Sequence, residues 1–276
     1  MRQFIAETEL DSRGCLEVAD KKFHYMRNVL RVIEGNMISV RLPDGTLQQM
    51  TVASVDEKKK IIVLQVAGAV QKQNDLHASP AANTNSVDLW LFQFVAKPAK
   101  MELIVRQAVE CGVSVIVPVA GTFCQSGAVT SAKEAAMMSG KGGRWDRIIT
   151  EAREQSGSAV NTRIENCVSV ADAVTLWKSV QEESKKESCA VVLYEQIAGT
   201  VPLHLAVGRT LAVRNAAVAV GAEGGISPNE IEIMQMGGFV PVHFATNILR
   251  CETAALYGIA TLQTALMEND IWQNRE

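Results

Sequence analysis

The chain has 276 residues, 47% of them hydrophobic, and its 27 lysine and arginine residues against 30 aspartate and glutamate residues give a formal net charge of −3. This length can bury the core of one large domain or two ordinary ones, and a charged fraction of 21% argues against an intrinsically disordered chain. The small net charge excludes a histone-like basic protein. It does not exclude a nucleic-acid-binding protein that confines its positive charge to one stripe of its surface.

The six cysteines and four histidines are scattered, with no C-x-x-C pair and no histidine at metal-ligand spacing from a cysteine. We therefore expect free thiols, as is usual in a reducing compartment, and no bound metal. The N-terminus reaches Glu7 too soon for the apolar region of a signal peptide, and the best apolar stretch, residues 211–222, is broken by Arg214. These features predict a soluble cytoplasmic protein.

Residues 1–70 predict a small β-barrel domain with one helix. Its hairpin signal is Pro43-Asp44-Gly45, which directly follows an alternating apolar segment. The helix candidate is 22–30, with Phe23, Met26, Val29 and Leu30 on one face. The strand candidates are residues 37–42, 49–52 and 61–64.

Residues 71–86 lose all periodicity and collect Asn, Ser, Ala, Pro and Gln, which indicates a linker. From residue 87 to residue 276, long apolar strands alternate with amphipathic helices, the pattern of an α/β domain. Continuous Val, Ala and Leu runs are typical of parallel strands that are covered on both faces. The predicted strands are 87–95, 113–119, 190–194, 216–220 and 239–244, and the predicted helices are 101–111, 144–155 and 170–180.

A glycine-rich loop, residues 221–226, follows the strand that ends at Val220. Ser227, Pro228 and Glu230 then predict a capping box with proline at the first helical position. Loops at the carboxyl ends of strands are where open α/β sheets bind ligands. The loop is neither G-x-G-x-x-G nor a phosphate loop, and taken alone it is equally compatible with a plain tight turn.

Two more loops of this kind accompany the glycine-rich one. Residues 245–250 follow the last predicted strand and precede an Ala-rich helix, and Glu195-Gln196 follow the strand at 190–194. Since the carboxyl ends of parallel strands meet at one edge, we expect the three loops to converge there.

Two C-terminal segments, GAEGGISPNEIE (221–232) and NILRCETAALYGIATLQ (247–263), resemble the cofactor motifs of the RsmE family. These are SPOUT-class methyltransferases that modify N3 of a specific uridine in 16S ribosomal RNA. The likeness covers nearly the whole chain, through RQFIA at the start, HYMRNVLRVIEGNMISV in the small domain, and KMELIVRQAVECGVSVIVPV and RWDRIITEAREQS in the middle.

The resemblance implies a PUA-like RNA-binding β-barrel over residues 1–70 and an α/β methyltransferase domain over 87–276 whose C-terminal end is threaded into a trefoil knot. It also implies S-adenosylmethionine as cofactor, the small ribosomal subunit as partner, and a homodimer with the active site at the subunit interface. Knots are rare exceptions to the usual rules of topology, and periodicity cannot reveal one.

Methylation at N3 requires an in-line approach of donor and base, and stabilisation of the negative charge that develops on the uracil oxygens. The resemblance favours Arg250 for orienting the base or stabilising that charge, and Glu252 for holding Arg250 or accepting the proton. The alternative is that Arg250 and Glu252 form a structural ion pair that fixes the loop. The expected cofactor contacts are Leu193, Tyr194, Glu195, Val220, Gly221, Ala222, Glu223, Gly224, Gly225, Phe244, Ala245, Asn247, Ile248 and Leu249. For Glu223 the alternative is a solvated carboxylate near a helix N-terminus.

Basic residues are the candidates for contacts to RNA phosphates. They gather on the small-domain helix and on two helices of the larger domain, although each one alone is equally compatible with a solvated face. The set is Arg2, His24, Arg27, Arg31, Arg106, Arg144, Arg147 and Arg153.

The chain departs from the family at the cofactor loops, where the family usually has Pro at the position of Ala222, Leu-Gly at Phe244-Ala245 and Arg at Asn247. Two hypotheses follow: an active uridine N3-methyltransferase, and a diverged, non-catalytic RNA-binding homologue that keeps the dimer and the PUA-like module. A Rossmann enzyme would instead need its glycine fingerprint after the first strand of the sheet, where this chain has Val95-Ala96-Lys97-Pro98.

Overall fold

The computed structural model describes residues 3–67, 87–184, 188–208 and 213–273, so Arg2 and the predicted linker 71–86 lie outside the described residues. The chain divides into two compact units. The first combines residues 1–79 with 153–159, and the second contains the remainder of the chain.

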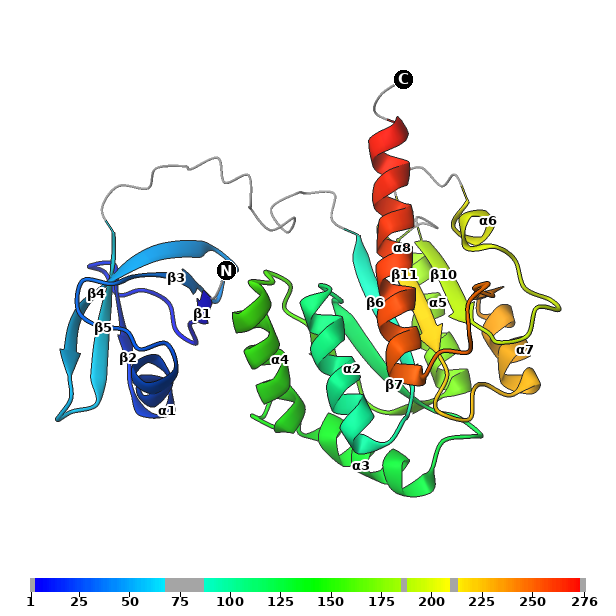
Figure 1. Cartoon of the computed structure of the whole chain (residues 1–276), viewed down its shortest axis with the longest axis horizontal. Coiled ribbons are helices and arrows are strands. Elements are labelled where there is room, and N and C mark those ends of the chain that lie inside the picture. The colour runs from blue at the N-terminus through cyan, green and yellow to red at the C-terminus, as the bar shows by residue number, and fades with distance from the viewer. Residues whose placement is uncertain (1–2, 68–86, 185–187, 209–212, 274–276) are drawn as a thin grey trace. The chain divides into compact units, whose positions relative to one another are not determined.

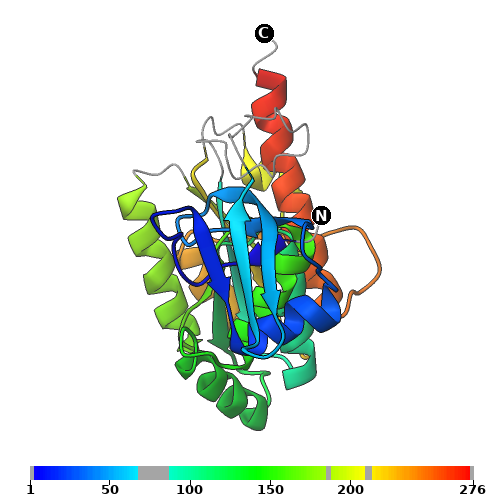
Figure 2. The same ribbon diagram turned by 90° about the vertical axis from the view of Figure 1, so that its left-hand side faces the viewer.

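The first unit is built on a five-stranded sheet of order β1-β3-β4-β5-β2. β1 runs parallel to β3, and the other neighbours are antiparallel. Figure 2 shows these strands side by side in blue and cyan. The strands are β1 (Gln3–Ile5), β2 (Cys15–Val18), β3 (Met37–Arg41), β4 (Leu47–Asp56) and β5 (Ile61–Val66).

The helix of this unit begins as α1 (Asp20–His24) and continues as a π-helix, η1 (Tyr25–Val29). Phe23 and Met26 are buried in the core of the unit, as the sequence predicts, but 55% of Val29 is exposed. A π-helix has more residues per turn than an α-helix, so a residue three positions after Met26 no longer lies on the same face. The prediction that Val29 is on the apolar face is therefore wrong.

The second unit contains a parallel sheet of order β12-β10-β11-β6-β7-β8, with β9 also pairing with β7. Every pairing in it is parallel, as the continuous apolar runs predict. Figure 1 shows its central strands behind helix α8. The strands are β6 (Asp88–Phe94), β7 (Val115–Ala120), β8 (Arg163–Ile164), β9 (Val168–Ser169), β10 (Ser188–Leu193), β11 (Asn215–Val220) and β12 (Val240–Val242).

Helices cover both faces of this sheet, which gives three layers (Figures 1 and 2). One core packs β-strand side chains against α2, α3, α4 and α8, and the other packs Phe92 against Trp177 of α5 and against Phe239. The sequence did not predict α3, whose buried stripe consists only of alanines. The helices are α2 (Pro98–Glu110), α3 (Ser126–Met137), α4 (Arg144–Ser156), α5 (Val170–Glu183), α6 (Leu203–Val207), α7 (Pro228–Met236) and α8 (Cys251–Gln273).

Helix α8 lies very close to the sheet at Gly258. A Cβ atom on this residue would sit 2.7 Å from Cδ1 of Leu193 and 3.1 Å from Cγ2 of Val218. The same helix packs against α2. This packing brings the first turn of α8 next to the first turn of α2, where the polar groups described below meet.

Candidate functional site

Three loops meet at the carboxyl edge of the sheet, as the sequence predicts. β10 lies between β11 and β12, and all three strands are parallel. The backbone N–H of Tyr194 donates to the carbonyl of Val242 at 3.0 Å, and Nδ1 of His243 lies 3.1 Å from the carbonyl oxygen of Tyr194. The loops that follow β10 and β12 are thus joined directly.

The glycine-rich loop has no room for side chains at two of its positions. A Cβ atom on Gly221 would lie 2.9 Å from the carbonyl carbon of Gly225, and one on Gly225 would lie 3.0 Å from a carboxylate oxygen of Glu195. Gly225 also has φ +76°, which favours glycine. The N–H of Gly225 donates to the carbonyl of Ala222 at 3.0 Å, which closes the turn.

A capping box ends this loop and starts α7. The N–H of Ser227 donates to Oε2 of Glu230 at 2.9 Å, and the Ser227 side chain accepts the N–H of Glu230. The other carboxylate oxygen of Glu230 accepts the N–H of Thr122 at 2.7 Å. Burial alone would raise the pKa of Glu230, but these hydrogen bonds outweigh it and hold the pKa below its ordinary value. The predicted cap is confirmed.

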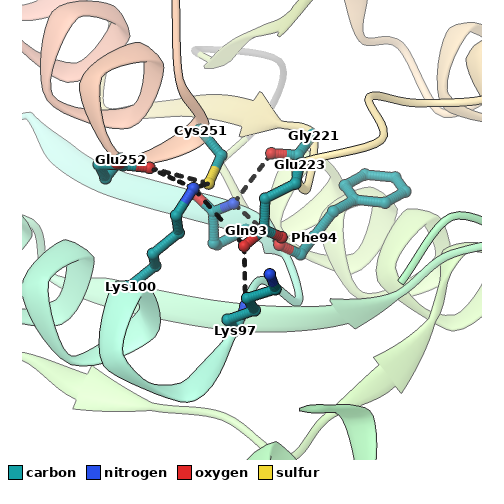
Figure 3. A network of polar contacts seen from close by, with 8 residues as sticks. All are labelled: Gln93, Phe94, Lys97, Lys100, Gly221, Glu223, Cys251 and Glu252. Atoms are coloured by element: carbon teal, nitrogen blue, oxygen red, sulfur yellow. Dashed lines mark hydrogen bonds and ion pairs between the residues drawn. The ribbon is translucent and has the colours of Figure 1, made fainter. Parts of the chain in front are cut away.

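Gln93, at the end of β6, anchors the start of the glycine-rich loop. Its side-chain Nε2 donates to the carbonyls of Phe94, Val220 and Gly221 at 2.9, 3.3 and 3.3 Å (Figure 3). The side chain is fully buried. Because all three neighbours are carbonyls, the amide can only point its nitrogen toward them.

Lys100, on the first turn of α2, lies at the centre of the polar cluster in Figure 3. Its ammonium lies 3.1 Å from Oε2 of Glu252 and 3.6 Å from Oε1 of Glu223. Glu223 also accepts the backbone N–H of Lys97 at 3.2 Å, and the thiol of Cys251 donates to Glu252 at 3.2 Å. The cluster therefore joins the glycine-rich loop to the first turns of α2 and α8.

The two ends of this ion pair shift each other's pKa. The hydrogen bond to Glu252 raises the pKa of the Lys100 ammonium. Burial alone would raise the pKa of Glu252, but hydrogen bonds from its own backbone, Cys251 and Lys100 outweigh it and lower the pKa. Burial and the hydrogen bond to Glu252 raise the pKa of the Cys251 thiol to about 11. Lys100 and Glu252 are therefore charged near neutral pH, and Cys251 is neutral.

Arg250 lies exposed at the end of the third loop. Within the described part of the chain, the ion pair of Glu252 is with Lys100, and none joins it to Arg250. The structural Arg250–Glu252 pair that the sequence left open is thus absent there. The Arg250 side chain remains available at the rim of the three loops.

The remaining predicted cofactor residues differ in exposure. Val220 and Ala222 are buried, Gly224 and Glu195 are exposed, and the side chain of Glu223 is partly buried. The aromatic ring of Phe244 packs edge-on against Tyr257 at a centroid distance of 5.0 Å. Leu193, Tyr194 and Leu249 are half-buried, and Ala245, Asn247 and Ile248 are exposed. The third loop therefore presents an open surface with a partly buried apolar floor.

In the first unit, the predicted RNA contacts His24, Arg27 and Arg31 line one hollow of about 490 Å³ together with Lys60. Arg27 is held at its wall, because Nε donates to Glu57 at 2.7 Å and Nη1 donates to the carbonyl of Val32. His24 and Arg31 are exposed. Basic side chains and the adjoining apolar Phe23 and Ile33 thus share one concave surface.

The other predicted RNA contacts are placed differently. Arg106, Arg144 and Arg147 are exposed, and Arg144 forms a two-bond ion pair with Glu102 of α2. Arg153 is half-buried, and burial lowers the pKa of its guanidinium. The backbone carbonyl of Arg153 accepts a hydrogen bond from Gln3 in the first unit. Unlike the exposed arginines of α4, the Arg153 side chain is therefore partly withdrawn from water.

All six cysteines are free. In residues 3–67, 87–184, 188–208 and 213–273, no group of three His, Cys, Asp or Glu side chains is arranged to hold a metal ion. Over the same ranges, no helix is both long enough and apolar enough to cross a membrane.

Comparison with known proteins identifies the family. The RNA methyltransferase domain matches residues 83–263. The chain is 31% identical over 178 residues to ribosomal RNA small subunit methyltransferase E of Aquifex aeolicus, an alignment that covers 63% of this chain and 68% of that protein. The chain belongs to this family of RNA methyltransferases.

Other members of the family match over nearly their full length. The methyltransferase E of Bacillus subtilis is 25% identical over 276 residues, covering 98% of this chain and 99% of that protein. The crystal structure of methyltransferase E from Neisseria gonorrhoeae bound to S-adenosyl methionine superposes with a TM-score of 0.72 at 23% identity, covering 96% of this chain and 97% of that one. The second unit thus has the α/β fold of this methyltransferase family.

Sequence patterns do not predict Gln93 and Lys100 as site residues. Apart from the carbonyl of Phe94, their partners lie far along the chain, and neither residue belongs to a recognisable local motif. Lys100 stands inside the segment KMELIVRQ that carries part of the family resemblance, but only the fold places it beside Glu223 and Glu252.

Proposed function

We propose that this protein transfers the methyl group of S-adenosylmethionine to N3 of a specific uridine in the 16S RNA of the small ribosomal subunit. The observation that carries the proposal is the convergence of three strand-end loops on one glycine cradle, joined to a lysine and two carboxylates. Family membership and the printed names of the relatives support the reaction and the substrate. The neighbouring structure bound to S-adenosyl methionine supports the cofactor.

The residues of the three loops fit this cofactor. The Gly221 and Gly225 positions leave bare backbone, which can approach a ligand closely, and Gly225 borders the carboxylate of Glu195. Leu193, Tyr194 and Phe244 supply an apolar surface for a planar base. Carboxylates suit the positive charge of the methyl donor and can accept hydrogen bonds from its hydroxyl or amino groups. When bound, the cofactor supplies an electrophilic methyl group on a positively charged sulfur.

Arg250 and Glu252 have different roles in the methyl transfer. The guanidinium of Arg250, exposed at the rim, orients the uracil and stabilises negative charge on its oxygens as the N3 proton leaves. Glu252, kept ionised by its hydrogen bonds, accepts that proton. Glu252 has its own partner in Lys100, which leaves Arg250 available for substrate.

The first unit holds the RNA as a PUA-like module. Its basic hollow offers His24, Arg31 and Lys60 to a phosphodiester backbone, and the exposed side chain of Ile33 gives a base an apolar surface. Arg106, Arg144 and Arg147 extend the phosphate contacts on the second unit. This division delivers one uridine to the cofactor loops while the rest of the RNA is held elsewhere.

The path of the C-terminal end supports a trefoil knot. β12 pairs with β10 on the side away from β11, yet α8 returns to pack against β11 and α2. In the knot that we propose, this returning segment passes through the connection between β10 and β11. Apolar side chains exposed beside these loops, including Ile197, Leu205 and Ile248, suit a homodimer interface at the site. The reducing interior of the cytoplasm, where its RNA substrate is assembled, suits the free cysteines.

The competing function is RNA binding without catalysis, as the substitutions at Ala222, Phe244, Ala245 and Asn247 allow. Calorimetry with S-adenosylmethionine separates the two. The methyltransferase requires saturable binding with one cofactor per active site, and weaker binding for Gly225→Val. The absence of detectable binding to the unaltered chain would leave only the RNA-binding module.

A further inference from the structure

The partners of Lys100 lie on two segments that are remote from it in the chain. Its ammonium contacts Glu252 on the first turn of α8 and Glu223 in the glycine-rich loop, at 3.1 and 3.6 Å. The three side chains are between 16% and 29% exposed. Partial withdrawal from water strengthens such pairs relative to exposed ones.

The cluster carries two carboxylates and one ammonium. Glu252 contacts Lys100 of α2 and the thiol of Cys251, its neighbour on α8, and Glu223 of the glycine-rich loop contacts the same ammonium. Cys251 is neutral near pH 7. Without Lys100, two negative charges would face each other across the gap between the loop and α8. Like charges at this range repel and drive side chains apart.

The first turn of α2 and the end of β6 form the fixed side of this arrangement. Gln93 holds the carbonyls of Val220 and Gly221, and the backbone N–H of Lys97 holds Glu223. Among the residues that the structure describes, no hydrogen bond joins the backbone of the first turn of α8 to the glycine-rich loop. That turn is tied to the loop through the Lys100 ammonium, which also lies 3.8 Å from the Cys251 sulfur.

We propose that Lys100 is a positioning residue of the methyl-transfer site: its ammonium bridges Glu223 and Glu252, and so fixes the glycine-rich loop against the first turn of α8. The role rests on the proposed function, since it serves the same site. Lys100 acts through the two glutamates and contacts no reactant. Its loss displaces both the cofactor loop and the proton acceptor.

The test compares Lys100→Met with Lys100→Arg, and with Lys178→Met as a control for losing one lysine from an exposed helix face. Each protein is measured for its dissociation constant with S-adenosylmethionine, its thermal midpoint, and kcat as a function of pH. We expect Lys100→Met to weaken cofactor binding and lower kcat by about tenfold to a hundredfold, the usual effect of removing a hydrogen bond to a charged group. Lys100→Arg should keep most of the cofactor affinity and most of kcat, and Lys178→Met should match the unaltered protein in both.

The pH profile separates positioning from a merely structural role. Lys100 helps to keep the pKa of Glu252 low, so its removal raises that pKa and moves the acid limb of kcat to higher pH. A structural lysine would reduce the amount of folded enzyme and leave the limb in place. In the double variant Lys100→Met with Glu252→Gln, we expect losses smaller than the product of the two single losses.

Two failures are distinguishable. If the unaltered chain does not bind S-adenosylmethionine, the proposed function fails and the role of Lys100 fails with it. If the unaltered chain binds and methylates, but Lys100→Met has the same dissociation constant, kcat and acid limb, only the role of Lys100 is overturned. If Lys100→Met does not fold, an unchanged dissociation constant and acid limb in Lys100→Gln would overturn it equally.

Discussion

The carboxylate of Glu230 accepts the backbone N–H of Thr122 at 2.7 Å while its other oxygen caps the start of α7. One side chain thereby fixes the glycine-rich loop on one side and the loop after β7 on the other. Both loops border the carboxyl edge of the sheet. A buried residue therefore connects two loops that border the proposed cofactor site.

Replacing Glu230 by Ala should destabilise the protein by about 2 kcal/mol, because the cap is lost together with the hydrogen bond that Glu230 accepts from the N–H of Thr122. Glu232→Ala, on the exposed face of the same helix, is the control. The folded-state pKa of Glu230 is lowered, so its contribution is complete above the unfolded pKa of about 4.3 and disappears as the pH falls through the folded value. Urea unfolding at pH 7 and pH 3 measures both effects, and an equal loss at both pH values would contradict this account.

Gly221→Ala tests the glycine cradle. The added Cβ would meet the backbone of Gly225, which cannot move without opening the loop. We expect cofactor affinity to fall at least tenfold while the protein remains folded. Gly127→Ala, where no atom lies within 4 Å of the new Cβ, is the matched control and should bind normally. Equal affinity of the two variants in calorimetry would show that the loop does not hold the cofactor.

Arg250→Ala tests the assignment of the exposed arginine. Because its side chain lies outside the Lys100 cluster, we expect kcat to fall by a factor of about a hundred or more with little change in the dissociation constant for S-adenosylmethionine. Arg250→Lys should recover only part of the rate, since it keeps the charge but not the planar fork. Full activity of Arg250→Ala would remove Arg250 from the mechanism.

The basic hollow of the first unit yields a matched pair of lysine variants. Lys60 lines the hollow, whereas the neighbouring Lys59 pairs weakly with Asp56 at the surface. We expect Lys60→Ala to weaken RNA binding and to reduce the slope of log affinity against log salt by about 0.7, the value for one phosphate contact to a single strand. Lys59→Ala should leave the slope unchanged. Filter binding of RNA over a series of salt concentrations measures both slopes. Identical slopes for the two variants would show that the RNA phosphates do not contact Lys60.

The sequence predicts well the features that are local in the chain. Ser227, Pro228 and Glu230 form their cap within four residues, and the apolar stripe of Met101, Ile104 and Val105 needs only helical periodicity to be recognised. Val29 was placed wrongly because a π-helix changes the number of residues per turn without a sequence signal. Lys100 and Gln93 could not be found, because their partners become neighbours only through the order of the strands.

The proposed knot and the proposed dimer would depend on how the chain closes on itself and on a second copy, and no local pattern specifies either. The family resemblance supplied both expectations. A structure of the protein in solution with its partner subunit would test the dimer through the surroundings of Ile197 and Ile248, whose exposed apolar side chains we expect to become covered.

The most direct measurement is mass-spectrometric mapping of 3-methyluridine in 16S ribosomal RNA from cells with and without this gene. The account predicts one position that loses its methyl group when the gene is absent and regains it with the unaltered gene, but not with Arg250→Ala. An unchanged modification profile in cells that lack the gene would contradict it.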